Sequence, residues 1–394
     1  MKINLSKTAS LTALTLIVVQ AALYIFMWTR LLDDPSLKGM DFISFYTAGR
    51  IAREGRYGQL YDLDLQRAVQ ARIVAAGTFE GGANLSQHPP YLAPLLSLLA
   101  VDDFVGAYIL WSAVRLGFTV LCAVLTQGWL RASGWSPLSA WMAALGAVGF
   151  FPVYLGLLGG QDTVFILLGL LLWLFGMDKR REALAGFGLA LSSLSPLAAG
   201  AVGLPLLATR RKAAAWFVGF MALLGIYSLL LVGTRGAADF LALMRLSSQG
   251  GGYGLNQDVM YNLLGLLLRS LPQANPATLR LAAWAAFAAA LVFSAVWWRT
   301  QPQGPGLERI GLALVLLTFT LPHLHTHALS MLLLPLLIAA QRLHAGGREG
   351  LALLLIPSVS TVLVLLTILA PTLTYPAYGL LMAGLALGLA WPKP

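Results

Sequence analysis

Cysteine is almost absent from this chain, which excludes two kinds of structure. Cys122 is the only cysteine in 394 residues, and apolar residues surround it in the sequence. A single cysteine can build neither a disulfide framework within the chain nor a cysteine metal site. We therefore expect Cys122 to be a buried, chemically inert thiol.

Charge is scarce as well. Only 11% of the residues are charged, whereas 58% are hydrophobic. Soluble domains have about 25% charged residues, so most of this chain must lie in hydrocarbon rather than in water. The 26 basic residues outnumber the 16 acidic ones, but they occur in short clusters between apolar runs, as in the cytoplasmic loops of membrane proteins. The excess of basic residues therefore marks the cytoplasmic side of a membrane protein, and we expect no nucleic-acid partner.

The sequence shows no internal repeat of fixed period. Many transporters are built from repeated halves with their binding site at mid-membrane. The missing repeat argues against such a fold. A transporter or flippase of a lipid-linked or small solute remains the alternative function.

The apolar runs predict an all-α polytopic membrane protein with about twelve spans. The first run, 11–29, follows Lys2 and Lys7 and is too long for a signal peptide, so we take it as an uncleaved span with a cytoplasmic N-terminus. The segment 183–208 lies between basic clusters and should form two short helices that turn near Pro196. The short run 89–101 should be re-entrant or interfacial. Further spans are predicted at 104–130, 137–155, 162–177, 213–233, 277–298, 308–322, 327–341, 351–370 and 375–391.

Two stretches are polar enough to leave the membrane. In the first, 32–88, the segments 42–54 and 62–76 have helix-spaced apolar residues, and we expect amphipathic helices on the outer bilayer surface. The second, 234–256, is predicted to be an external loop containing Arg245 and a glycine-rich run. With basic clusters inside, both termini should be cytoplasmic.

In this topology the polar residues gather on the extracytoplasmic side. That side offers neither ATP nor nucleotide sugars, so a group-transfer enzyme working there needs a donor carried by lipid, such as a polyprenyl-phosphate sugar. The residues concerned are Asp41, His88, Gln161, Asp162, Asn256, Gln257, Asp258, His323, His325 and His327.

Several short motifs recur in the order of a known family over nearly the whole chain. They are Asp41-Phe42 with Tyr46, Gly58-Gln59-Leu60-Tyr61-Asp62, Pro89-Pro90, Gly160-Gln161, Asn256-Gln257, and Pro322-His323 with His325 and His327. The sequence thereby resembles the family-87 glycosyltransferases of the GT-C superfamily, which include polyprenol-phosphate-mannose-dependent mannosyltransferases and related arabinofuranosyltransferases. Ser195 stands where the family often has a lysine, and His88 where it often has an aromatic residue.

The resemblance implies one membrane-embedded GT-C domain over 1–394, in a bacterial cytoplasmic membrane. It implies inverting transfer of mannose or arabinofuranose from a polyprenyl-phosphate donor to an extracytoplasmic lipid or glycan acceptor, with no cofactor and no metal. It also places the catalytic base at Asp41. The alternative for Asp41 is a plain N-cap of the helix 42–54.

Most of the other candidates have more than one possible role. The three histidines could bind the donor phosphate, orient Asp41, hold a metal, or form an ordinary interfacial cluster. Arg115 lies in a predicted span and could contact phosphate or form a structural pair. Gln161, Asp162, Asn256 and Gln257 could bind sugar hydroxyls or cap helices. Tyr46, His88 and Arg245 complete the predicted donor- and acceptor-binding set.

Overall fold

The computed structural model describes residues 5–34, 40–74, 84–248, 257–300 and 306–390, and within these ranges the chain is helical and contains no strand. Among these described residues, seven helical segments are long and apolar enough to cross a membrane, and a pair bent by 50°, α6 (Pro137–Val148) and α7 (Phe151–Gly159), would make an eighth. The seven are α1 (Leu5–Leu32), α5 (Phe104–Ala132), α11 (Arg211–Ser248), α13 (Pro276–Arg299), η5 with α15 (Thr326–Leu332 and Leu333–Ala345), α16 (Glu349–Leu369) and α17 (Pro371–Ala390).

The other predicted crossings are shorter helices. They are α8 (Thr163–Asp178), α9 (Glu182–Ser192), α10 (Pro196–Thr209) and α14 (Leu307–Thr320). The helix break between α9 and α10, just before Pro196, confirms the predicted turn. A full crossing needs about 20 residues. α8 is buried along most of its length, and a helix enclosed by protein does not have to reach both membrane surfaces.

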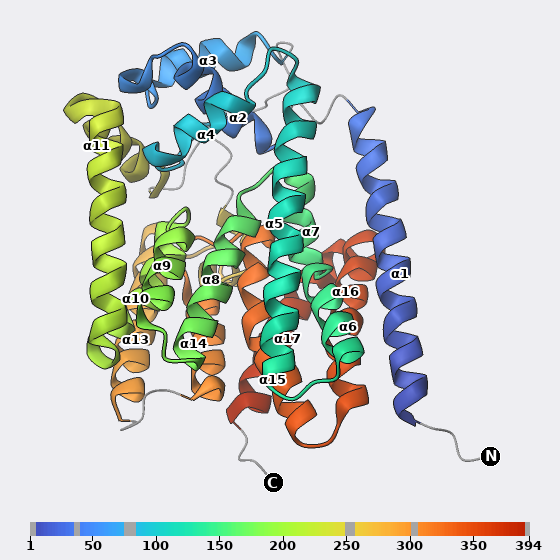
Figure 1. Ribbon diagram of the computed structural model, residues 1–394. Helices are drawn as coiled ribbons and strands as arrows, with labels where there is room; N and C mark the ends of the chain where they lie inside the picture. Colours follow the sequence, from blue (N-terminus) through green and yellow to red (C-terminus); the bar gives the residue numbers. More distant parts are fainter. Residues whose placement is uncertain (1–4, 35–39, 75–83, 249–256, 301–305, 391–394) are drawn as a thin grey trace.

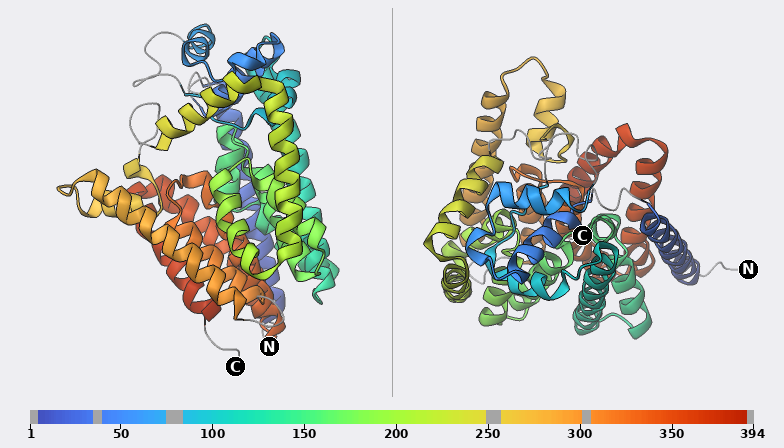
Figure 2. Two further views of the ribbon diagram at one scale, coloured as in Figure 1. Left: turned by 90° about the vertical axis from the view of Figure 1, so that its left-hand side faces the viewer. Right: turned by 90° about the horizontal axis from the view of Figure 1, so that it is seen from above.

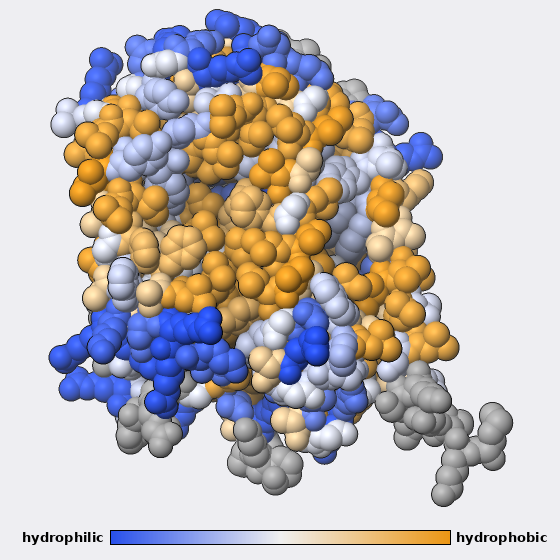
Figure 3. All heavy atoms as spheres, in the orientation of Figure 1, coloured by the Kyte–Doolittle hydropathy of each residue, from blue (hydrophilic) through white to orange (hydrophobic). Residues whose placement is uncertain are grey.

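A polar layer covers one end of the bundle (Figure 1). It contains α2 (Phe42–Arg53), η2 (Tyr57–Gln59), α3 (Leu63–Ala71), η3 (Pro90–Leu92) and α4 (Ala93–Leu99). α1 begins and α17 ends at the opposite end of the molecule. On the face shown in Figure 3, apolar side chains form a band between two hydrophilic ends, as expected of a chain that spans a bilayer.

The two predicted surface helices both form, but the position of the first is wrong. α2 is buried on almost every side, and it lies so close to α4 that a methyl group at Gly49 would come within 2.5 Å of the Leu96 carbonyl oxygen. α2 therefore packs inside the protein rather than on the bilayer surface. An amphipathic pattern shows which face is apolar, but it does not show whether lipid or protein covers that face.

The predicted loop 234–256 is also wrong over its first part. α11 continues to Ser248 after a bend at Gly233, where φ is 68° and ψ is −178°. Only glycine adopts that backbone conformation readily. Beyond the bend the helix turns across the polar layer (Figure 2), and Phe240 contacts the Tyr61 ring with centroids 4.9 Å apart. The glycine-rich run falls outside the described residues.

Candidate active site

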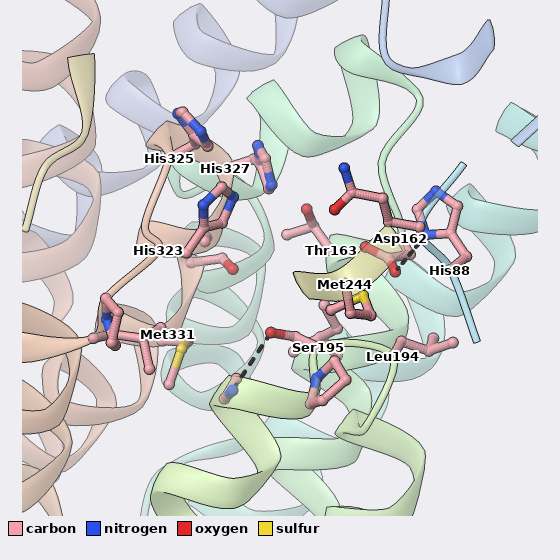
Figure 4. Close-up of a pocket in the computed structure, with 18 of the residues that line it drawn as sticks. His88, Asp162, Thr163, Leu194, Ser195, Met244, His323, His325, His327 and Met331 are labelled. Carbon is pink, nitrogen blue, oxygen red and sulfur yellow. Dashed lines mark hydrogen bonds and ion pairs between the residues drawn. The ribbon is translucent and has the colours of Figure 1, made fainter. Parts of the chain in front are cut away.

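A cavity of about 280 Å³ lies where the polar layer meets the bundle. Its wall comes from the segment before η3, from α8, the α9–α10 turn, α11, α12 (Leu263–Ser270) and α13, and from the segment 321–331. Figure 4 shows His323, His325 and His327 on one side of this space, and Asp162 and His88 on the other. Residues as far apart in the sequence as Gln87 and Met331 therefore share one site.

Asp162 and His88 form the buried acid–base pair of the cavity. His88 Nδ1 lies 3.8 Å from Asp162 Oδ2. Burial lowers the pKa of His88 to about 3. Burial also raises the pKa of Asp162 to about 7, against the opposing effects of its backbone hydrogen bond and the Arg115 charge. The low polarity of the site thus disfavours charge on both partners.

Three contacts fix His88 in place. Its ring stacks on Phe45 with centroids 3.6 Å apart, its Nε2 lies 3.3 Å from the Ser44 hydroxyl, and its carbonyl accepts a 2.6 Å hydrogen bond from Tyr61. Phe45 and Ser44 belong to α2. The buried helix therefore positions an imidazole in the cavity wall.

Asp41 precedes α2 but does not cap it through its side chain. The half-buried carboxylate instead accepts a 3.2 Å hydrogen bond from Asn84 Nδ2. Its charge acts on Asp162 and on His325, both of which line the cavity, although Asp41 is outside the lining itself. The plain N-cap reading of Asp41 is therefore not supported by the hydrogen bonds.

A glycine in the turn between α7 and α8 allows this turn to pack closely against the start of α2, where Asp41 lies. Gly160 has φ of 80°, and a side chain there would lie 2.4 Å from Phe42 Cβ. A methyl group at Gly159 would lie 3.7 Å from Asp41 Oδ2. The contact at Gly159 would be an ordinary one, so it is glycine at position 160 that lets the turn pack directly on the start of α2 and brings Asp162 near Asp41.

Two glutamines of α3 hold the segment 84–86, which contains Asn84. Gln70 is buried, donates a 2.7 Å hydrogen bond to the Asn84 carbonyl and accepts one of 3.0 Å from its amide. Gln66, one turn earlier, accepts from the Ser86 amide at 2.8 Å. α3 therefore holds the partner of Asp41 through both groups of its backbone.

Two of the three histidines, His323 and His325, lie in the segment that leads into η5, and His327 lies in its first turn. The rings of His323 and His325 meet edge to face with centroids 4.7 Å apart, and those of His325 and His327 are 6.4 Å apart. Burial lowers the pKa of His323 and of His325, while the Asp41 charge opposes the effect on His325. Among the described residues, no three His, Cys, Asp or Glu side chains are grouped to hold a metal ion.

A family model for glycosyltransferase family 87 matches residues 87–321, which is more than half of the chain. The chain belongs to glycosyltransferase family 87. No curated protein and no solved structure matches it. The matched region contains His88, Asp162 and most of the cavity wall, and the resemblance read from the short motifs is confirmed. The protein is thus a membrane glycosyltransferase.

In this glycosyltransferase the side chain of Arg115 makes hydrogen bonds that support the fold. Its side chain is fully buried and donates to the carbonyls of Gly156 and Leu157 at 3.1 and 2.6 Å and to the Ser112 hydroxyl at 2.7 Å. The guanidinium therefore binds the last turn of α7. Arg115 is not part of the cavity wall.

Tyr46 is also outside the cavity wall. Its hydroxyl donates to the carbonyls of Val101 and Asp102 at 2.8 and 3.2 Å, which ties α2 to the connection between α4 and α5. Gln257 lies in the wall, whereas Gln161 does not, and Arg245 is exposed near the end of α11. Asn256 is outside the described residues.

Sequence reasoning missed several residues of the wall, among them Arg280 and Trp284 on α13. Both fall inside an apolar run that reads as an ordinary span. The signal that could have identified them is their spacing, because residues i and i+4 lie on one face of a helix. Thr163, Met244 and Met331 also line the cavity without having been predicted.

Proposed function

We propose that the enzyme transfers a sugar from a polyprenyl-phosphate donor to a hydroxyl of a lipid or glycan acceptor, with inversion at the anomeric carbon. Mannose and arabinofuranose are the sugars that the motifs favour. The observation that carries the proposal is the Asp41 carboxylate. It does not cap a helix through its side chain, and its charge acts on ionisable residues of the cavity wall at one end of an apolar bundle.

In the proposed reaction Asp41 is the general base. Its carboxylate accepts the proton of the acceptor hydroxyl while that oxygen attacks the anomeric carbon from the face opposite the phosphate. The bond between the anomeric carbon and the phosphate oxygen breaks, and the phosphate leaves with the electron pair. The products are a glycoside with inverted configuration and a polyprenyl phosphate. Asn84 orients the carboxylate through its amide.

Asp162, His88 and Gln257 are proposed to bind the sugar. At neutral pH, with a pKa near 7, Asp162 is present both as acid and as carboxylate, so it can donate to or accept from a sugar hydroxyl. His88 is neutral there and offers one donor and one acceptor. We assign His323 and His325 to the departing phosphate oxygens, to which a neutral imidazole can donate.

The cavity is proposed to face the extracytoplasmic side of the cytoplasmic membrane. Basic clusters at 179–181 and 210–212 flank α9 and α10, at the ends of these helices away from the polar layer in Figure 1. The positive-inside rule then assigns that end to the cytoplasm. In this orientation the cavity faces the extracytoplasmic side, where a lipid-linked sugar donor would be available.

The test is incubation of the purified protein with a panel of polyprenyl-phosphate sugars and a membrane lipid extract. A new glycolipid should form with one of the donors, and the Asp41→Asn variant should form it far more slowly. No product with any donor, from a folded protein, would contradict the proposed reaction.

A further inference from the structure

The cavity wall contains one strongly basic side chain. Of the described residues that line it, Arg280 alone is a lysine or arginine. Arg280 is half-buried in the second turn of α13, and its Nε donates to the Pro276 carbonyl at 3.3 Å.

A cation is needed because the other groups of the wall supply little positive charge. A sugar linked to polyprenyl phosphate carries one negative charge, and the phosphate gains another when the glycosidic bond breaks. Burial lowers the pKa of His88, His323 and His325, so these imidazoles are mainly neutral at neutral pH. A guanidinium stays charged and binds phosphate oxygens in pairs.

One turn further along α13, a large apolar side chain lines the cavity. Trp284 is part of the cavity wall and is 42% exposed. Leu281, three residues before it, is also exposed, and α13 is one of the segments long and apolar enough to span a membrane. Exposed apolar side chains of α13 thus lie next to the cavity, where a lipid chain would leave it.

Two neighbouring helices also contribute apolar residues to the cavity wall. Met244 of α11 and Leu264 of α12 line the same cavity. In the left view of Figure 2, α13 runs from the level of α12 toward the end of the molecule where α17 ends. Arg280 lies near the start of this helix and lines the same cavity as these apolar residues. A phosphate bound by Arg280 would therefore leave its attached lipid chain next to apolar side chains.

We infer that Arg280 binds the phosphate of the polyprenyl-linked donor and that Trp284 contacts the first isoprene units, which leave the cavity between α11, α12 and α13. The inference rests on the proposed function and specifies how its donor is bound. Arg280 would stabilise the charge that develops on the leaving phosphate, while the proton of the acceptor goes to Asp41.

The experiment compares the binding of polyprenyl phosphate with that of polyprenol of the same length to the full-length protein, by native mass spectrometry. The wild type should prefer the phosphate. Arg280→Gln should lower that preference at least about tenfold, because a hydrogen-bonded charge is lost, and Arg280→Lys should retain part of it. Arg299→Gln is the matched control, because Arg299 is an exposed arginine at the other end of the same helix.

Trp284→Ala should weaken the binding of both lipids, because it removes apolar contact but no charge. Unchanged phosphate binding by Arg280→Gln, or a wild type that binds polyprenol equally well, would overturn the inference. A protein with Arg280-dependent binding that transfers no sugar would instead contradict the proposed reaction. Sugar transfer with an unchanged donor KM in Arg280→Gln would leave the reaction in place and remove Arg280 from it.

Discussion

His88 Nδ1 lies 3.8 Å from Asp162 Oδ2 inside the cavity, although the two residues belong to different structural layers. His88 precedes η3 in the polar layer, and Asp162 begins α8 in the bundle. The pair therefore joins the two layers at the proposed sugar site. A substitution that moves either layer should therefore change the pKa of Asp162.

The Asp41→Asn variant should fold normally and lose turnover. Asparagine keeps the shape of the side chain, but its amide cannot accept the proton of the acceptor hydroxyl. Loss of a general base typically lowers the rate about a hundred- to ten-thousand-fold. Turnover, thermal stability and donor affinity should be measured together, with Asp64→Asn, an exposed residue in the same layer, as the control. If the variant keeps more than about a tenth of the activity, a group other than Asp41 must act as the base.

Stability should depend on pH through Asp162. Because the pKa of its carboxyl in the folded protein, about 7, lies above the unfolded value of 3.8, the folded state retains a proton that the unfolded state has lost. The contribution of Asp162 to stability is thus complete below about pH 4 and is lost as the pH rises through 7. Asp162→Asn cannot ionise. Its Tm relative to wild type should rise by at least about 2 °C between pH 5 and pH 8, and a pH-independent difference would contradict the shift.

Arg115→Met should destabilise the fold. The substitution removes hydrogen bonds to the Gly156 and Leu157 carbonyls in the last turn of α7 and leaves those buried oxygens with fewer donors. We expect a loss of at least about 2 kcal/mol, since hydrogen bonds from charged groups are among the stronger ones. Thermal unfolding at one scan rate is the measurement. Arg131→Met, an exposed arginine in the last turn of α5, is the control and should leave Tm unchanged.

Membrane topology can be tested with single cysteines in a Cys122→Ser background. Arg67 of α3 and Arg211 at the start of α11 are both exposed. In intact cells an impermeant thiol reagent should label the Arg67→Cys variant. It should label the Arg211→Cys variant only after the cells are permeabilised. The reverse pattern would place the cavity on the cytoplasmic side.

Most helices could be predicted because long apolar runs must satisfy their backbone hydrogen bonds internally. The break before Pro196 followed from the missing amide of proline. α2 was placed on the surface because its sequence alternates polar and apolar faces, and only the tertiary structure shows that α4 and the Gly160 turn cover it. The helix after Gly233 was missed because glycine, threonine and arginine in sequence read as a loop.

The site could be predicted in part. His88, Asp162, Gln257, His323, His325 and His327 were selected as polar residues at the ends of apolar runs, and all of them line the cavity. Arg280 and Trp284 could not be selected that way, because a single arginine and a tryptophan near the end of a span are common anchors at membrane interfaces. Their role depends on the neighbouring helices, which the sequence of α13 does not reveal.

The clamp of Gln70 on Asn84 has a consequence for how turnover could be changed from a distance. Gln70 holds both backbone groups of Asn84, and Asn84 in turn donates to the Asp41 carboxylate. Gln70 is not among the residues that line the cavity. A substitution at Gln70 should therefore slow turnover by disturbing the orientation of one carboxylate, while the surface that binds the donor stays as it is.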